Sequence, residues 1–268
     1  MKDLSNIYNK YNFLIQEDTF DFNKFNQYAI VHHSNAIEGS TLTKSETFLL
    51  LDEQLTPKNK PLEHTLMAID HLNALKFVVD LANSKKSLTE EILKKIASLL
   101  LKQTGSEISA IGGTFDSSKG DFRKVNVRAG VSTFINYQKV PERVRELLIY
   151  TNDTIEKLSD FDAINKLAFD VHFQLVSIHP FADGNGRISR LLMNYVQQYH
   201  HVPLSVIYKE DRQEYFNALV ETRVAEDISI FTEFMFLQTE KYLLEKIEEL
   251  SKKQVIKKSK EDKMSFLF

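Results

Sequence analysis

The chain has 268 residues, a formal net charge of −3, 43% hydrophobic residues, 26% charged residues and no cysteine. This composition is ordinary for a soluble globular protein that buries a substantial core. The absence of cysteine excludes disulfides and cysteine-based zinc sites and suits a reducing cytosol, so we expect a cytoplasmic location. The near-neutral charge and the lack of a long apolar window mean that neither nucleic acid nor a membrane is an expected partner.

The first part of the chain is predicted to be helical. Apolar residues at helical spacing predict helices over 3–16 and 21–38, and Gly39 is suited to end the second helix. Thr43 and Glu46 have the spacing of a capping box, which predicts a helix start before the next apolar run.

Further helices are expected downstream. Residues 87–90 read Ser-Leu-Thr-Glu, and Ser87 with Glu90 is a second predicted capping box. Helices over 61–82 and 142–158 each follow a proline, which is favoured at the first helical position. The histidine pairs at 32–33 and 200–201 point in different directions on a helix. We therefore expect surface or capping roles for them and no metal site.

One segment differs from the helical pattern. Residues 122–135 form a β-prone run, with Gly120 before it, Gly130 inside it and Pro141 after it. This pattern predicts a small hairpin.

Residues 179–190 read His-Pro-Phe-Ala-Asp-Gly-Asn-Gly-Arg-Ile-Ser-Arg and are the most informative segment. Apolar spacing predicts a helix on each side, over 164–178 and 191–200. Pro180 is expected to end the first helix, because the residue before a proline avoids the helical region. Phe181 is interpreted as an anchor in the core.

The polar groups of this segment favour a phosphate site. Gly184 and Gly186 allow backbone N–H groups to turn toward an anion, and Arg187 and Arg190 follow at helical spacing. A helix N-terminus attracts anions, and an imidazole and a carboxylate beside it offer a base and a Mg²⁺ ligand. Each group alone has an ordinary structural role, but their coincidence in twelve residues favours a site.

The last part of the chain is expected to be one long helix. Asp227 is suited to cap it. Beyond Lys252 the chain becomes basic, and five lysines between 252 and 260 indicate a solvated helix face rather than a nucleic-acid patch.

Residues 179–190 resemble the signature of the Fic family, His-x-Phe-x-Asp/Glu-Gly-Asn-Gly-Arg-x-x-Arg, with no departure at any specified position. The resemblance extends over about residues 25–240. It implies an all-α, Fic-type helical domain with a small β-hairpin flap. It also implies transfer of AMP from ATP to a Ser, Thr or Tyr hydroxyl of a target protein.

The family roles carry over residue by residue. His179 would take the proton from the attacking hydroxyl, and Asp183 would hold Mg²⁺. The backbone of 184–186 would form an anion hole, Arg187 would bind the β-phosphate and Arg190 the γ-phosphate. The resemblance therefore implies nucleotide contacts from Asp183, Gly184, Asn185, Gly186, Arg187, Ile188, Ser189 and Arg190.

Residues 34–39, Ser-Asn-Ala-Ile-Glu-Gly, resemble the family's inhibitory signature, Ser/Thr-x-x-x-Glu-Gly/Asn. Their position implies the subgroup whose inhibitory helix precedes the core, with Ser34 and Glu38 as its key residues. A carboxylate at a helix C-terminus is unfavourable unless a cation awaits it. The resemblance implies that Arg190 is that cation and that the pair blocks the γ-phosphate. An ordinary exposed glutamate before a capping glycine is the alternative.

Two further segments resemble family features. Gly-Asp-Phe-Arg at 120–123 resembles the lead-in to a target-docking flap, whose expected docking residues are Val131, Ser132, Thr133 and Phe134. Residues 211–216 resemble the helix that borders the adenine, which implies Tyr215 and Phe216, although aromatics at this spacing also suit a core. Some relatives have Asn at about position 223, where this chain has Arg223.

The predicted organisation is N-terminal helices with the inhibitory helix at 1–60, a Fic core at 61–240 and a helical tail at 241–268. The predicted function is a protein adenylyltransferase that uses ATP and Mg²⁺ and is held in check by Glu38. Two alternatives stay open: removal of AMP from a modified target, with Glu38 positioning water, and a non-catalytic nucleotide-sensing module, against which the intact His179 argues. Self-modification and a homodimer are also compatible with this interpretation.

Overall fold

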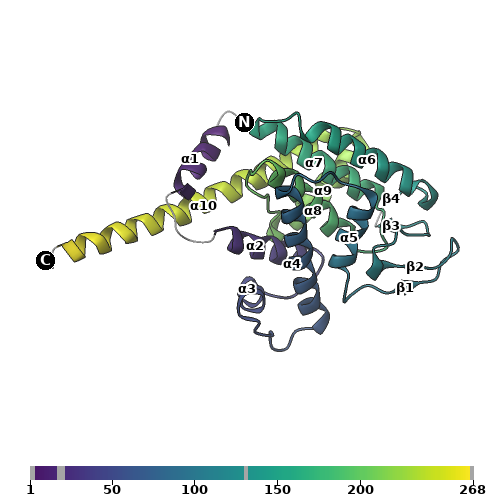
Figure 1. Cartoon of the computed structure of the whole chain (residues 1–268), viewed down its shortest axis with the longest axis horizontal. Coiled ribbons are helices and arrows are strands. Elements are labelled where there is room, and N and C mark those ends of the chain that lie inside the picture. Colours follow the sequence, from purple (N-terminus) through teal and green to yellow (C-terminus); the bar gives the residue numbers. More distant parts are fainter. Residues whose placement is uncertain (1–3, 17–21, 130–131, 266–268) are drawn as a thin grey trace.

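The computed structural model describes residues 4–16, 22–129 and 132–265. Along these residues the chain folds into ten α-helices and two short hairpins, which confirms the expected all-α class (Figure 1). The helices are α1 (Leu4–Gln16), α2 (Phe22–Ile37), α3 (Lys44–Glu53), α4 (Leu62–Asn83), α5 (Glu90–Leu100), α6 (Val140–Ile155), α7 (Phe161–Ile178), α8 (Asn185–Tyr199), α9 (Arg212–Ala225) and α10 (Ile228–Ser265).

The helix starts follow local capping chemistry. Thr43 and Glu46 form the predicted capping box, in which each side chain accepts a hydrogen bond from the other residue's backbone N–H. The second predicted box is wrong. Thr89, and not Ser87, caps α5, because its extended backbone lies directly before the helix and its hydroxyl accepts from the N–H of Ile92.

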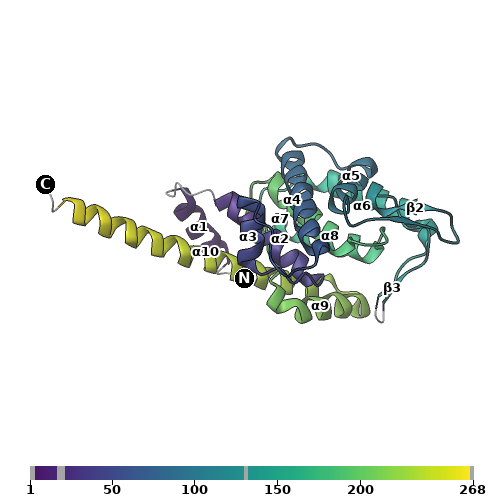
Figure 2. The ribbon, with the colours of Figure 1, turned by 90° about the horizontal axis from the view of Figure 1, so that it is seen from below.

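The innermost helix is α8, which packs against α7 and α4 (Figures 1 and 2). All of its residues are buried except Gly186 and Gln198, which are half-buried. The buried residues include the two arginines of the glycine-rich motif. Phe181, in the loop that precedes α8, is 1% exposed, which confirms it as a core anchor. The motif is therefore anchored in the core through Phe181 in the loop and through α8. Gly186, in the first turn of α8, is half-buried.

The flap is a short hairpin, as the β-prone run predicted. Strand β3 (Arg128–Ala129) pairs antiparallel with β4 (Ser132–Thr133), with Arg128 opposite Thr133. Val131, one of the expected docking residues, lies outside the described residues. A second hairpin was not predicted: β1 (Glu107–Ile108) pairs with β2 (Phe115–Asp116) across a loop that contains Gly113 at φ +105°. The two consecutive glycines at 112–113 were the sequence signal that could have predicted a turn here.

The histidine pair of α2 corrects a sequence-based expectation. His32 and His33 are 3% and 6% exposed rather than on the surface. Nδ1 of His32 lies 3.3 Å from the Thr47 hydroxyl, and Nδ1 of His33 accepts from the N–H of Lys209 at 3.2 Å. The two rings therefore tie α2 to α3 and to the segment before α9.

The C-terminal helix α10 begins as predicted, with the Asp227 carboxylate accepting from the N–H of Ser229 at 2.9 Å. It packs against α9 and α1 and then extends away from the helical body (Figures 1 and 2). It runs through position 241 without a break, so the predicted tail begins inside a helix.

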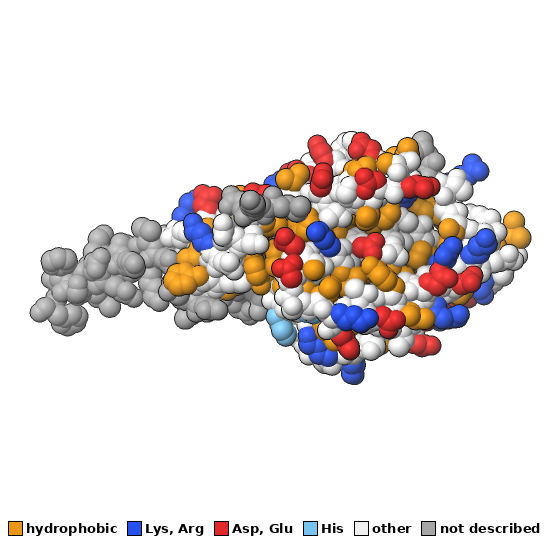
Figure 3. Space-filling model, turned by 90° about the horizontal axis from the view of Figure 1, so that it is seen from above, with side chains coloured by type: hydrophobic (Ala, Val, Ile, Leu, Met, Phe, Trp, Pro, Cys, Tyr) orange, Lys and Arg blue, Asp and Glu red, His pale blue; other side chains and the backbone are white. Residues whose placement is uncertain are grey.

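Figure 3 shows a face on which acidic and basic side chains are interspersed with apolar ones. Within the described ranges, we find no helix that combines the length and the apolar character needed to cross a membrane.

Candidate active site

The motif loop, residues 179–184, begins where α7 ends. His179 adopts a left-handed conformation (φ 54°, ψ 58°), and its N–H donates to the Leu175 carbonyl at 3.0 Å. The helix thus stops before Pro180, as predicted, through a left-handed cap rather than an extended residue. The ring atom Nδ1 lies 3.3 Å from the Val176 carbonyl, and a carbonyl oxygen only accepts, so Nδ1 is the donor. Nε2 is then left as the basic nitrogen.

The electrostatic environment keeps this imidazole neutral. The pKa of His179 is lowered to about 4, mainly by burial and also by the charges of Arg123 and Arg223, while the hydrogen bond to Val176 and the charge of Glu38 oppose this shift. At neutral pH the ring is therefore in the form that accepts a proton.

Asn185 shapes the loop between the base and α8. Its side-chain oxygen accepts from the N–H of Phe181, and its side-chain amide donates to the Phe181 carbonyl, both at 2.9 Å. The residue is 3% exposed. Its side chain is thus committed to the loop, and any contact with an anion falls to its backbone.

The first turn of α8 is open to an anion. Gly184 precedes it with φ +76°, and no side chain caps the helix. The first N–H groups of a helix have no intrahelical partner, so those of Asn185, Gly186 and Arg187 face the loop with the helix's positive end behind them. This arrangement fits the anion hole that the motif predicted.

Arg187 supports the same conclusion. It is 3% exposed, and one terminal nitrogen lies 3.2 Å from the Asp183 carboxylate. Its Nε and other terminal nitrogen are buried and lack a partner. Unsatisfied buried donors are costly, and a bound anion is a ligand that would satisfy them.

Arg190 is fully engaged. Its Nε donates to the Ser34 hydroxyl at 2.7 Å, and one terminal nitrogen donates to the Ser34 carbonyl at 3.1 Å and to Glu38 at 2.6 Å. Its other terminal nitrogen lies 3.4 Å from the Tyr215 hydroxyl. Burial opposes the charge, but Glu38 and Tyr215 hold the pKa of Arg190 above its ordinary value. The structure therefore brings together the two predicted inhibitory residues and this arginine.

The Glu38 carboxylate also lies against the anion hole. A Cβ built on Gly186 would be 2.5 Å from Oε1 of Glu38 and 3.3 Å from Arg190. Gly186 is thus the position at which the Glu38 carboxylate and the first turn of α8 meet. A residue with a side chain there would displace the carboxylate.

Tyr215 does not have the environment expected of an adenine contact. It is 1% exposed, and its hydroxyl lies 3.1 Å from Nε2 of His172, which is itself fully buried. Its ring is a core group that supports Arg190, because no open face is left for a base to stack on. Phe216 is half-buried, and the Arg212 guanidinium lies 4.8 Å from its ring.

Arg123 is a site residue whose role the sequence did not predict. It is 1% exposed and donates at 2.7 Å to three carbonyls, those of His179, Val125 and Ile135. Its own N–H donates to Pro180 at 2.9 Å. It therefore connects both ends of the flap to the motif loop. The Gly-x-Phe-Arg lead-in was the signal that marked the position.

The fit of a magnesium ion rests on Asp183. Its side chain is 72% exposed and stands at the mouth of the site beside Arg187. In the described part of the chain no group of three or more His, Asp or Glu side chains forms a metal cage. Mg²⁺ usually takes one or two protein carboxylates together with water and substrate phosphates, so this single carboxylate suits it.

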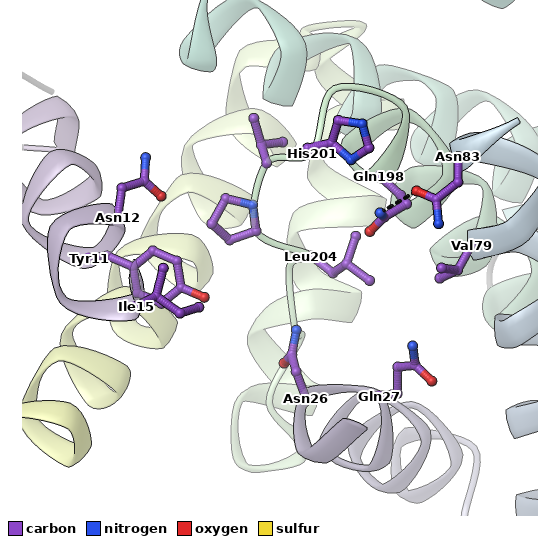
Figure 4. Close-up of a pocket in the computed structure, with 12 residues that line it drawn as sticks. Tyr11, Asn12, Ile15, Asn26, Gln27, Val79, Asn83, Gln198, His201 and Leu204 are labelled. Carbon is purple, nitrogen blue, oxygen red and sulfur yellow. Dashed lines mark hydrogen bonds between the residues drawn. The ribbon is translucent and has the colours of Figure 1, made fainter. Parts of the chain in front are cut away.

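A cavity of about 300 Å³ lies elsewhere, between α1, α2 and the segment after α8 (Figure 4). Side-chain amides dominate it, including a Gln198–Asn83 hydrogen bond of 2.7 Å. Its lining holds no Asp, Glu, Lys or Arg, so it lacks the arginine and lysine cations that typically neutralise a phosphate. The chemistry of the motif, rather than cavity size, therefore locates the candidate site.

Comparisons with known proteins agree with this geometry. Residues 87–197 match the Fic/DOC family. The chain is 31% identical over 216 residues to protein adenylyltransferase Fic of Nematostella vectensis, which covers 79% of this chain and 46% of that protein. The corresponding protein of Aedes aegypti is 31% identical over 220 residues, or 80% of this chain and 40% of its own.

The fold has solved counterparts. A Fic domain-containing signaling protein from Bacteroides thetaiotaomicron has a TM-score of 0.77 and 25% identity, covering 93% of this chain and 98% of its own. Fic-1 of Caenorhabditis elegans has a TM-score of 0.75 and shows the same fold at 20% identity, over 94% of this chain and 72% of its own. The fold and the motif define a Fic-type domain, and the chain belongs to the Fic family. It spans less than half the length of the curated relatives named above.

Proposed function

We propose that this protein is a protein adenylyltransferase, which transfers AMP from ATP to a hydroxyl side chain of a target protein. The observation that carries the proposal is the convergence of one neutral imidazole, one open helix N-terminus and two buried arginines in a single loop and helix turn. Relatives named protein adenylyltransferases support the same activity.

The proposed reaction uses His179 as general base. The hydroxyl oxygen of the target attacks the α-phosphorus of ATP, its proton passes to Nε2, and the bond between the α- and β-phosphates breaks to release pyrophosphate. Because Nδ1 is committed to the Val176 carbonyl, the ring keeps one orientation through this step. General bases of this kind typically contribute ~10²–10⁴-fold to a rate.

The other groups bind charge. The N–H groups at the start of α8 and the unpaired donors of Arg187 would bind the phosphates, and a free Arg190 would reach the terminal one. Asp183 would hold Mg²⁺, which neutralises phosphate charge when it is bound. Positioning and charge neutralisation are the main contributions of proteins to phosphoryl chemistry.

Glu38 is proposed to act as a brake. It occupies Arg190 and lies against Gly186, so the γ-phosphate and the carboxylate compete for one space and one cation. Both are anionic, so a carboxylate beside the helix N-terminus repels the phosphate.

The test is incubation with ATP labelled on the α-phosphate and Mg²⁺, comparing wild type with Glu38→Gly. We expect stronger labelling of target and of the enzyme itself by the variant. Glu53→Gly is a matched control, because Glu53 also ends a helix before a positive-φ residue, Gln54, and is exposed. Equal labelling by wild type and Glu38→Gly at saturating ATP would refute the brake, and no labelling by either would refute the transferase.

A second candidate activity is removal of AMP from a modified target. The observation that favours it is the position of the Glu38 carboxylate, beside Gly186 where a phosphate would bind. A carboxylate there can orient a water molecule toward the phosphorus.

A further inference from the structure

The flap covers the imidazole of the catalytic loop through one aromatic ring. Phe134, directly after β4, stacks on His179 with ring centroids 3.9 Å apart and an interplanar angle of 17°. Both residues are half-buried. One face of the imidazole is therefore occupied by the flap itself.

Arg223 of α9 lies close to this stack. Its guanidinium carbon is 5.7 Å from the centre of the Phe134 ring and 5.9 Å from that of Phe173 on α7. Its Nε donates at 3.3 Å to the hydroxyl of Ser177, two residues before His179. Arg223 therefore touches both the flap and the helix that carries the imidazole, and guanidinium groups within about 6 Å of an aromatic face are attracted to it.

We propose that Arg223 is a positioning residue, which holds Phe134 of the flap against His179 and so sets the orientation and solvent access of the catalytic imidazole. The catalytic role of His179 rests on the proposed function, but the contacts that join Arg223, Phe134 and His179 do not.

The stack adds to the charges that face His179. These are Arg123 from the start of the flap segment, Arg223 from α9 and Glu38 from the end of α2, together with the Val176 carbonyl of α7. Burial is the largest influence on this ring, and Phe134 supplies part of it. If Arg223 releases Phe134, the ring gains water and loses a neighbouring cation, and both changes favour its protonated form.

The first test is NMR titration of the histidine ring protons in the full chain without ATP, with His179 assigned by its loss in His179→Gln. In wild type we expect the stacked Phe134 ring to shift the His179 ring protons upfield and the pKa of His179 to be about 4. In Arg223→Gln we expect at least half of the upfield shift that Phe134→Ala removes to be lost, with the pKa rising toward the ordinary value of about 6.5.

Val224→Ser is the matched control, because Val224 is the neighbouring residue on α9 and is 81% exposed. It should keep both the upfield shift and the low pKa. If Arg223→Gln fails to fold, Arg223→Lys replaces it, since lysine keeps the charge without the planar guanidinium. If the Arg223 variant that folds keeps the full upfield shift of the His179 protons, the proposal is overturned.

A double variant separates position from charge. In the Phe134→Ala background, Arg223→Gln should change the pKa of His179 far less than it does alone, because there is no ring left to hold. If the two substitutions act additively, Arg223 works by charge only and the positioning role is wrong.

The second test is the pH profile of AMP transfer in the Glu38→Gly background. A base works only when unprotonated, so raising its pKa from 4 toward 6.5 moves the acid limb of the profile upward. At pH 5.5 relative to pH 7.5 we expect roughly tenfold lower transfer with Arg223→Gln and little loss without it. An unshifted limb in the variant contradicts the proposal. If no variant transfers AMP, the proposed function fails while the NMR result still decides the positioning role.

Discussion

The carboxylate of Glu38 and the guanidinium of Arg190 lie 2.6 Å apart, although 151 residues separate them in the chain. The arginine is buried and the glutamate side chain is about one-third exposed, so the pair is reached from solvent on the side of the glutamate. Removing the carboxylate leaves the buried cation with the two oxygens of Ser34 as its nearest acceptors. An incoming phosphate would then supply the missing negative charge.

His179→Ala should abolish AMP transfer in the Glu38→Gly background while ATP binding stays within a few-fold. The imidazole is assigned to proton removal, and the phosphates are assigned to α8 and its arginines. Calorimetric ATP titration and labelling of the same preparations test this assignment. Retained transfer would eliminate His179 as the base, and loss of ATP binding would indicate a structural role instead.

Asp183→Ala should remove most of the Mg²⁺ dependence of ATP binding without unfolding the protein. The carboxylate is largely exposed, but it is the side-chain partner of the buried Arg187, so we expect a loss of stability that falls short of unfolding. ATP affinity measured over a Mg²⁺ series distinguishes the variant from wild type. A metal dependence that matches wild type would contradict the metal assignment.

Tyr215→Phe should lower stability and leave ATP affinity nearly unchanged. The hydroxyl connects Arg190 to the buried His172, and its loss strands a buried ring nitrogen at a cost of about 1–3 kcal/mol. Chemical denaturation and ATP titration measure the two effects. If Tyr215 instead stacked on the adenine, Tyr215→Ala, which removes the ring, would lower ATP affinity by more than it lowers stability. Tyr215→Phe, which keeps the ring, would not.

Wild type, supplied with an AMP-modified target, should remove AMP, and Glu38→Gly should remove it much more slowly. Hydrolysis needs a positioned water, and Glu38 is the carboxylate that lies over the anion hole. Mass spectrometry of the target after incubation with each form measures the removal. Removal by Glu38→Gly at the wild-type rate would show that Glu38 is a brake only.

Local features of the site were predictable because their causes lie within a few residues. The end of α7 before Pro180, the glycine-rich start of α8 and the capping box at Thr43 each depend on backbone conformation and hydrogen bonds over one helical turn. The capping assignment at Ser87 failed for a related reason, since Thr89 lies closer to the helix and competes for the same N–H groups.

The sequence by itself determined the motif, the helix ends and the all-α class, because spacing and turn chemistry act along the chain. Only the tertiary structure decided which side chains meet across it. It buried Tyr215 and His33 as core groups, and it gave Arg123 three carbonyl partners. It also stacked Phe134 on His179. Such contacts depend on how separate helices pack against one another. The separation of two residues along the sequence does not predict whether packing brings them into contact.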